Sequence, residues 1–279
     1  MAAAIPSAKD PTTASSCRSG WVVVAAFGAA TASLGLVFSL LASPFVDLSL
    51  WLIFRRCASI AAALSLWLVA RRQGRSVASY GLFAPSQGGT AVLSGLLLGA
   101  LGLAVLLGGE LALGVCRIQI TPNHAKLWRT VIGFLPAALL VSVLEELVFR
   151  GLILQHLLDC SKPLAVAVSS VLYSVVHLKT AAFGLGLWLE LGGLALLGVV
   201  LSLSYLRTGR LFAAVGMHTV MAYAARVNKL VIAFPNSPLN WLIGTNRLVN
   251  GIAGWLVLCG IAVVITRWSR PSDLRAPAR

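Results

Sequence analysis

Acidic residues are scarce in this chain. Only eight of its 279 residues are aspartate or glutamate, and charged residues make up 11% of the total. Soluble globular domains carry about 25% charged residues, so this composition excludes an ordinary water-soluble protein. The scarcity also makes any carboxylate within an apolar stretch a candidate functional group, because charge at membrane depth is costly.

Paired cysteines at metal-binding or redox spacing are also absent. The five cysteines are scattered singly along the chain: Cys17, Cys57, Cys116, Cys160 and Cys259. This pattern argues against a disulfide framework and against a thiolate zinc site. The net charge of +14 does not indicate nucleic-acid binding, because no basic stripe with interleaved aromatic residues occurs. The Lys and Arg residues form small groups between apolar runs, as in loops that face an anionic leaflet.

Long apolar runs, by contrast, are abundant. Hydrophobic residues make up 58% of the chain, and the mean hydropathy is +0.91. Runs of roughly 17 to 25 residues, which suffice to cross about 30 Å of hydrocarbon, predict an all-α, polytopic transmembrane helical bundle with about eight membrane helices. The predicted spans are residues 21–43, 51–70, 90–115, 130–156, 163–178, 183–205, 211–225 and 248–268.

Two adjacent glutamates, Glu145 and Glu146, lie in the fourth predicted span, within Val-Leu-Glu-Glu-Leu-Val-Phe-Arg-Gly. In a helix Glu146 and Arg150 share a face, whereas Glu145 is rotated by about 100° from its neighbour. We therefore expect Glu146 to pair with Arg150 and Glu145 to face another group. A carboxylate in a low-dielectric site becomes an effective proton acceptor near neutral pH, so Glu145 is the candidate general base.

Two histidines, His177 and His218, lie in later apolar stretches. Imidazoles in spans are rare and need partners. Tyr173 precedes His177 by four residues, so on a helix it would share a face with His177 and could orient it through its ring or its hydroxyl.

The glutamate and the two histidines would come from three helices and could build either of two sites. In one, Glu145 and His177 deprotonate a water that attacks a peptide carbonyl, while His218 donates a hydrogen bond to the oxyanion. In the other, Glu145, His177 and His218 ligate a zinc ion that activates the water. The residues alone leave both alternatives open.

The order and spacing of these motifs resemble the CAAX prenyl protease and bacteriocin-processing (CPBP, or Abi) family of intramembrane endopeptidases, which includes CAAX prenyl protease 2-like proteins. The resemblance covers residues 130–225. It rests on Glu-Glu-x-x-x-Arg, aromatic-x-x-x-His and a later His, here Glu145, Glu146, Arg150, Tyr173, His177 and His218. It implies about eight transmembrane helices whose motif residues converge on a cavity within the membrane.

The resemblance also implies a role for each motif residue. Glu145 and His177 would activate the water, His218 would help to stabilise the oxyanion, and Glu146 with Arg150 would brace the site. Such proteins have been regarded both as metallo-type and as glutamic-type proteases, so the resemblance does not select between the two alternatives.

Two positions depart from the family pattern. The aromatic residue of the second motif is usually Phe and is Tyr173 here, and the last motif is commonly His-x-x-x-Asn, whereas Ala222 follows His218 by four. If that Asn donates to the oxyanion, its loss could cost about 10² to 10³ in rate. Asn228, a backbone amide or a water could take its place; otherwise the catalyst is weak or the fold has a non-proteolytic role.

Other intramembrane protease chemistries lack their residues in this chain. All four aspartates fall outside the predicted spans, which excludes an aspartyl dyad, and neither His-Glu-x-x-His nor Gly-x-Ser-Gly occurs. The sequence thus predicts an intramembrane endopeptidase, glutamic-type or metallo-type, that acts on a membrane-bound or lipidated, CAAX-like protein or peptide. The alternative is a non-catalytic immunity or transport-assisting membrane protein.

The predicted organisation follows from the spans and motifs. We expect an integral membrane protein in contact with lipids, in a bacterial plasma membrane by default, and not bound to nucleic acid. Lys and Arg are more frequent in the loops on the side of the termini, which predicts cytoplasmic termini. The predicted regions are a flexible tail (1–20), N-terminal membrane helices (21–129), the catalytic core (130–226), an interfacial segment with the last span (227–270) and a basic tail (271–279).

Overall fold

The computed structural model describes residues 11–83, 86, 88–177, 184–235, 237–245 and 247–268. The chain forms two compact units. The first comprises Met1–Val77 and Leu152–Val166, and the second comprises Ala78–Gly151 and Ala167–Arg279. The predicted basic tail and the first ten residues of the predicted flexible tail lie outside the described residues.

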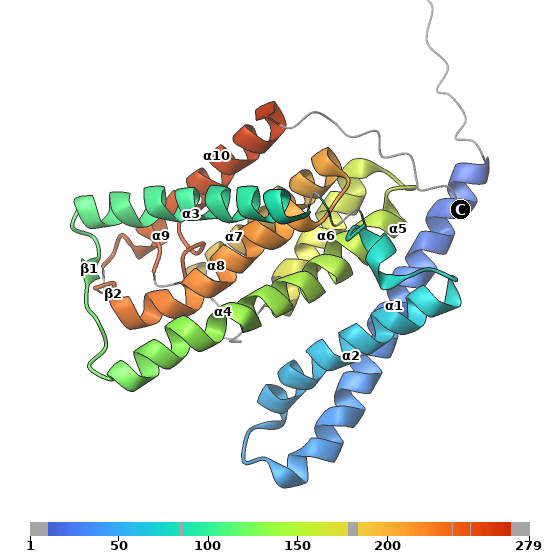
Figure 1. The fold of residues 1–279 in the computed structure, drawn as a ribbon, viewed down its shortest axis with the longest axis horizontal. Helices are drawn as coiled ribbons and strands as arrows, with labels where there is room; N and C mark the ends of the chain where they lie inside the picture. The colour runs from blue at the N-terminus through green and yellow to red at the C-terminus, as the bar shows by residue number, and fades with distance from the viewer. Residues whose placement is uncertain are drawn as a thin grey trace, which may run out of the picture. The chain divides into compact units, whose positions relative to one another are not determined.

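A helical hairpin makes up most of the first unit. Helix α1 (Pro11–Ala42) and helix α2 (Leu50–Arg72) pack side by side (Figure 1). The short helix α5 (Gln155–Leu157) packs against α1. This contact needs a glycine, because a Cβ at Gly20 would stand 2.0 Å from the His156 carbonyl oxygen.

The second unit is built around helix α8 (Phe212–Val231), which packs on α3 (Gly88–Ala112), α4 (His124–Glu146) and α7 (Leu185–Thr208). In Figure 1, α4 and α8 run in similar directions, and α3 lies at an angle to both. Helices α9 (Asn240–Ile243) and α10 (Ile252–Trp268) also belong to this unit, whereas the π-helical segment that continues α4 (Leu147–Leu154) and helix α6 (Lys162–Val176) each contribute residues to both units. A two-residue antiparallel pair, β1 (Arg117–Ile118) with β2 (Ile232–Ala233), ties the end of α8 to the segment after α3.

Glycines let α3 and α8 approach until their backbones touch. A Cβ at Gly95 would stand 2.1 Å from the Ala213 carbonyl oxygen, and one at Gly216 would stand 2.2 Å from the Val92 carbonyl oxygen. Small residues at helix interfaces are typical of membrane proteins, because association there depends on close van der Waals packing. This contact fixes the position of α8, the helix that carries His218.

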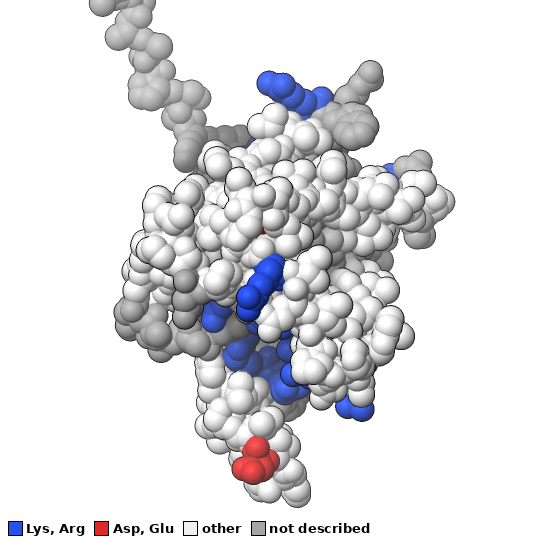
Figure 2. Space-filling view, turned by 90° about the vertical axis from the view of Figure 1, so that its left-hand side faces the viewer, with Lys and Arg blue, Asp and Glu red and all other residues white. Residues whose placement is uncertain are grey.

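The predicted fold class, an all-α polytopic membrane bundle, is confirmed, with a difference in span lengths. Five of the described helical segments are long and apolar enough to cross a membrane: Ser15–Phe45, Leu50–Arg72, Gly88–Ala112, His124–Leu157 and Leu185–Thr208. The fifth and eighth predicted spans correspond to the shorter apolar helices α6 and α10, and the seventh corresponds to α8. On the face drawn in Figure 2, Lys and Arg occur in a few groups and most of the surface carries neither sign of charge, as contact with lipid requires.

Two predicted boundaries are corrected. The predicted flexible tail reaches residue 20, but α1 begins at Pro11; proline suits a first helical turn, where its missing N–H would have no partner in any case. The seventh predicted span ends at residue 225, but α8 continues to Val231, because polar side chains near a helix end do not interrupt the backbone hydrogen bonds.

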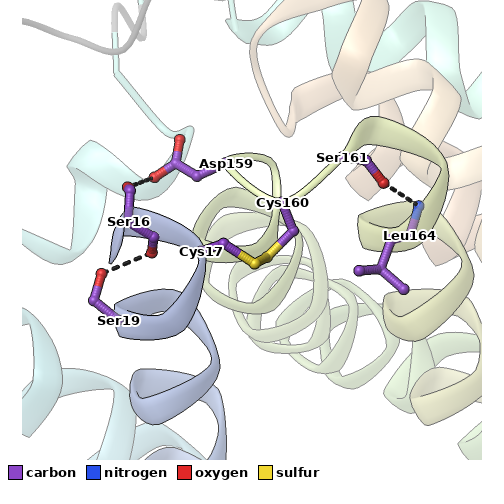
Figure 3. The surroundings of a disulfide bond; sticks show 7 residues. All are labelled: Ser16, Cys17, Ser19, Asp159, Cys160, Ser161 and Leu164. Atoms are coloured by element: carbon purple, nitrogen blue, oxygen red, sulfur yellow. Dashed lines mark hydrogen bonds between the residues drawn. A yellow bond between two sulfur atoms is a disulfide. The ribbon is translucent and has the colours of Figure 1, made fainter. Parts of the chain in front are cut away.

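The scattered cysteines argue against a disulfide framework, but the structure contains one disulfide. Cys17 in α1 and Cys160, between α5 and α6, form a disulfide (Figure 3). Beside it the Ser16 hydroxyl donates a hydrogen bond to the Asp159 carboxylate. The two cysteines are 143 residues apart, so no sequence pattern marks them as partners.

The disulfide bears on the predicted orientation. Disulfides persist in oxidising compartments and are rare in the cytosol. The Lys and Arg count, however, places the same side of the bundle, with Arg18 and Lys162, in the cytoplasm. The two signals favour opposite sides, and the cytoplasmic location of the termini stays a prediction.

The disulfide should stabilise the first unit. We expect Cys17→Ser to lower the free energy of unfolding by about 2–4 kcal/mol, because a long closed loop loses its cross-link. Cys57→Ser, which removes a free cysteine of α2, should have little effect. In the wild type, maleimide labelling of the denatured protein should modify three thiols without reductant and five after reduction; labelling of all five without reductant would refute the pairing.

The glycine contact between α3 and α8 can be tested within one helix. Gly95→Ala should destabilise the protein by about 1–3 kcal/mol, since the added methyl group meets a backbone oxygen. Gly109→Ala, also in α3, meets nothing within 4 Å and should be neutral or slightly stabilising. Thermal unfolding in detergent would compare the two variants, and equal stabilities would contradict this account of the interface.

Candidate active site

The site begins where α4 passes into the π-helical segment. The apolar sequence of α4 ends at Glu145 and Glu146, and residues Leu147–Leu154 continue with the wider i→i+5 turn. Single turns of π-helix inside α-helices often occur at functional sites, because they alter the direction of neighbouring side chains. Here Glu145 and Glu146 are the last residues of α4, and Arg150 lies within the π-helical segment that follows.

Glu146 and Arg150 form a fully buried ion pair. Arg150 Nη1 donates to Glu146 Oε1 at 2.8 Å, and both side chains are 0% exposed. Arg150 Nη2 donates to the Gly198 carbonyl of α7 at 3.0 Å, and the guanidinium lies 4.8 Å from the centre of the Tyr173 ring. The pair that the sequence predicts is therefore present, and it joins the end of α4 to α7 and α6.

His218 of α8 binds the same carboxylate oxygen. Its Nδ1 lies 2.8 Å from Glu146 Oε1, and its side chain is 3% exposed. Glu146 thus accepts hydrogen bonds from Arg150 and from His218 through one oxygen, while its second oxygen, Oε2, has no partner among the described residues.

Glu145 faces the two histidines. Its Oε2 lies 3.3 Å from His177 Nε2 and 3.5 Å from His218 Nε2. The side chains of Glu145 and His177 are each 24% exposed, although the Glu145 Oε2 atom that faces the histidines is itself buried and has no hydrogen-bond partner among the described residues. The structure therefore brings together the three residues that the sequence predicts to be catalytic, from α4, from the turn after α6 and from α8.

The i, i+4 spacing allows the Tyr173 hydroxyl to contact His177, but in the structure this hydroxyl contacts His218. It lies 3.2 Å from His218 Nε2. The Tyr173 ring instead lies against the His177 ring, with centroids 4.4 Å apart, and its backbone carbonyl lies 2.7 Å from His177 Nδ1. The i, i+4 spacing does bring the two residues together, but the hydroxyl extends beyond its own helix to α8.

The alternative of a zinc site does not fit these contacts. Within the described part of the chain, no three His, Cys, Asp or Glu side chains form a group that could hold a metal ion. The lone pair that His218 Nε2 would give to a metal is also within hydrogen-bond distance of the Tyr173 hydroxyl. No step through a metal is therefore derived for this site.

Asn228 is too far from His218 to replace the asparagine side chain that the family pattern has at the position of Ala222. Asn228 follows His218 by ten residues in the same helix, a rise of about 15 Å at 1.5 Å per residue. It is buried near the far end of α8. Of the substitutes considered from the sequence, a backbone amide or a water remains.

One contributor to the site could not be found from the sequence. Gly198 accepts the Arg150 hydrogen bond through its carbonyl, and a Cβ on Gly198 would stand 2.9 Å from Ser170 Cα of α6. Glycine here lets α6 and α7 approach closely and leaves the carbonyl available to Arg150. The only sequence signal is a glycine within a long apolar helix, which has no specific meaning by itself.

An apolar cavity of about 280 Å³ lies along α8, and none of the candidate site residues lines it. Thr219, the residue after His218, lines it together with side chains of α3 and α4. Its walls are mainly Leu, Val and Ala, with Tyr223 and Asn228 as the other polar residues. The cavity could hold an apolar chain but offers little to a charged group.

Comparison with known proteins agrees with this geometry. Residues 127–224 match the family described as type II CAAX prenyl endopeptidase Rce1-like. The match covers about a third of the chain. The Rce1-like segment runs from α4 to α8 and contains every predicted site residue, so the predicted CPBP relationship is confirmed and protease activity is supported. No curated protein and no solved structure gives a significant match to the chain.

The ion pair at the base of the site should be essential for stability. Arg150→Met leaves the Glu146 carboxylate buried without its cation and should cost about 3–5 kcal/mol in the free energy of unfolding. The double variant Glu146→Gln/Arg150→Met removes both charges and should be more stable than the single variant. Thermal unfolding in detergent measures both, and a wild-type melting temperature for Arg150→Met would disprove the charge-pairing argument.

Proposed function

We propose that this protein is an intramembrane endopeptidase that hydrolyses a peptide bond in a membrane-associated or lipidated, CAAX-like protein or peptide. One observation carries the proposal: Glu145 Oε2 lies 3.3 Å and 3.5 Å from the Nε2 atoms of His177 and His218. A carboxylate and two imidazoles around one point form a set of proton acceptors and donors suited to general acid–base catalysis.

In the proposed reaction, a water bound beside Glu145 and His177 loses a proton to the Glu145 carboxylate. The resulting hydroxide forms a bond to the carbonyl carbon of the peptide, and the carbonyl oxygen becomes an oxyanion. The carbon–nitrogen bond then breaks, and the proton passes from Glu145 to the leaving amine. The products are a carboxylic acid, which keeps the second proton of the water, and a free amine, so the atoms and protons of the water are all accounted for.

The substrate class rests on two kinds of support. The family description names CAAX prenyl endopeptidases, whose substrates carry a lipid near the cleaved bond. The apolar cavity beside Thr219 supplies a surface that favours a lipid or a large apolar side chain, because apolar area is removed from water on binding. A free hydrophilic peptide would gain nothing there.

The base can be tested by an isosteric substitution. Glu145→Gln removes the proton acceptor while keeping the shape, and it should lower kcat by about 10²–10⁴. Cleavage of a fluorogenic peptide with an isoprenylated cysteine three residues before its carboxyl end, in lipid vesicles, gives the rate. The same peptide without the lipid tests the substrate class.

Glu110→Gln is the matched control. Glu110 is a buried carboxylate of α3, and its Oε2 has no hydrogen-bond partner in the described structure, so its neutral isostere should leave cleavage unchanged. If wild type, Glu145→Gln and Glu110→Gln are equally inactive on peptides with and without the lipid, the protease proposal fails. Protection of cells by all three proteins in an immunity assay would then favour the non-catalytic alternative.

A further inference from the structure

The Tyr173 hydroxyl is the one phenol group that reaches the histidines from within the packed interior of the described structure. Tyr173 is 2% exposed, so water does not satisfy its O–H group. Buried tyrosine hydroxyls are normally hydrogen-bonded, and the Tyr173 hydroxyl lies 3.2 Å from His218 Nε2. The direction of this hydrogen bond decides what His218 can do.

Glu146 determines the tautomer of His218. Glu146 Oε1 accepts from Arg150 at 2.8 Å and lies 2.8 Å from His218 Nδ1. An ionised carboxylate can only accept hydrogen bonds, so Nδ1 carries a proton. A neutral imidazole then has a lone pair at Nε2. His218 is buried, and the charge of Glu146 is already balanced by Arg150, so nothing at Nδ1 requires a second proton on the ring.

The lone pair at Nε2 therefore needs a donor. Glu145 Oε2, at 3.5 Å, is an acceptor and cannot supply one when ionised. The Tyr173 O–H can. His177 differs, because its Nε2 lies closer to Glu145, at 3.3 Å, and both side chains are partly exposed; that pair is suited to share a proton.

We propose that Tyr173 is a positioning residue whose hydroxyl donates to His218 Nε2 and, with Glu146 at Nδ1, fixes the tautomer and the ring orientation of His218 beside Glu145. This inference rests on the proposed protease function and refines it. With its Nε2 lone pair occupied by the Tyr173 hydroxyl, His218 does not act as a resting donor to the oxyanion; it stays in place beside Glu145, which carries the proton from the water to the leaving amine. The hydroxyl of Tyr173 thus has a function that a phenylalanine could not perform.

Tyr173→Phe tests the assignment. The ring and its contacts with His177 and Arg150 are kept, and only the hydroxyl is lost. We expect kcat to fall about 3- to 10-fold, as for the loss of one hydrogen bond, with KM unchanged. In the wild type, ¹⁵N NMR of labelled histidine should show His218 with its proton on Nδ1 and an accepting Nε2, and Tyr173→Phe should shift the Nε2 signal. The chain has four histidines, so His218→Gln assigns the resonance.

Ser169→Ala is the matched control. Ser169 lies one turn before Tyr173 in α6, is fully buried, and donates its hydroxyl to the Phe149 carbonyl at 2.8 Å. Its loss also removes one buried hydrogen bond from the same helix, but it should change neither kcat nor the His218 signals. Thermal unfolding of both variants shows whether any loss of activity reflects lost stability.

The outcomes separate this inference from the proposed function. If the wild type cleaves the lipidated peptide and Tyr173→Phe has wild-type kcat with an unchanged His218 Nε2 signal, the inference is wrong and the protease stands. A proton on His218 Nε2 in the wild type would also overturn it. If no variant and no wild type cleaves any peptide, the protease fails, while the NMR comparison still decides the Tyr173–His218 hydrogen bond.

Discussion

The whole site depends on one carboxylate oxygen. Glu146 Oε1 accepts from Arg150 and from His218, and all three side chains are buried. In a low-dielectric interior an unpaired charge is very unfavourable. The chain therefore cannot move Arg150 or His218 far without exposing a buried charge, and this constraint holds α8 and the Arg150 partner in α7 to the end of α4.

Close helix packing makes that constraint possible. Glycines allow α3 to touch α8 at Gly95 and Gly216, and allow α6 to touch α7 at Gly198. A larger residue at any of these positions would separate the helices by more than a hydrogen bond tolerates. The neighbouring glutamates Glu145 and Glu146 face different partners because successive residues of a helix are rotated by about 100°.

Burial divides the polar residues into two groups. Tyr173, His218, Glu146 and Arg150 are almost or fully buried, whereas Glu145 and His177 are partly exposed. The first group can hold fixed hydrogen bonds without competition from water, whereas the side chains of the second group are partly open to the surroundings. Preorganised acid–base catalysis requires that rigid, buried polar side chains hold the reacting groups in place. The four buried residues are arranged in this way around Glu145 and His177.

The sequence alone determined the membrane-spanning helical class, the Glu146–Arg150 pair and the residues of the site, because hydropathy and i, i+4 spacing are local properties. It could not decide that the Tyr173 hydroxyl reaches His218, that Asn228 lies far from the site, or that Cys17 pairs with Cys160. Each of these depends on how separate segments pack against one another. Neither periodicity nor composition records the distance between side chains on different helices, so only the tertiary structure could decide them.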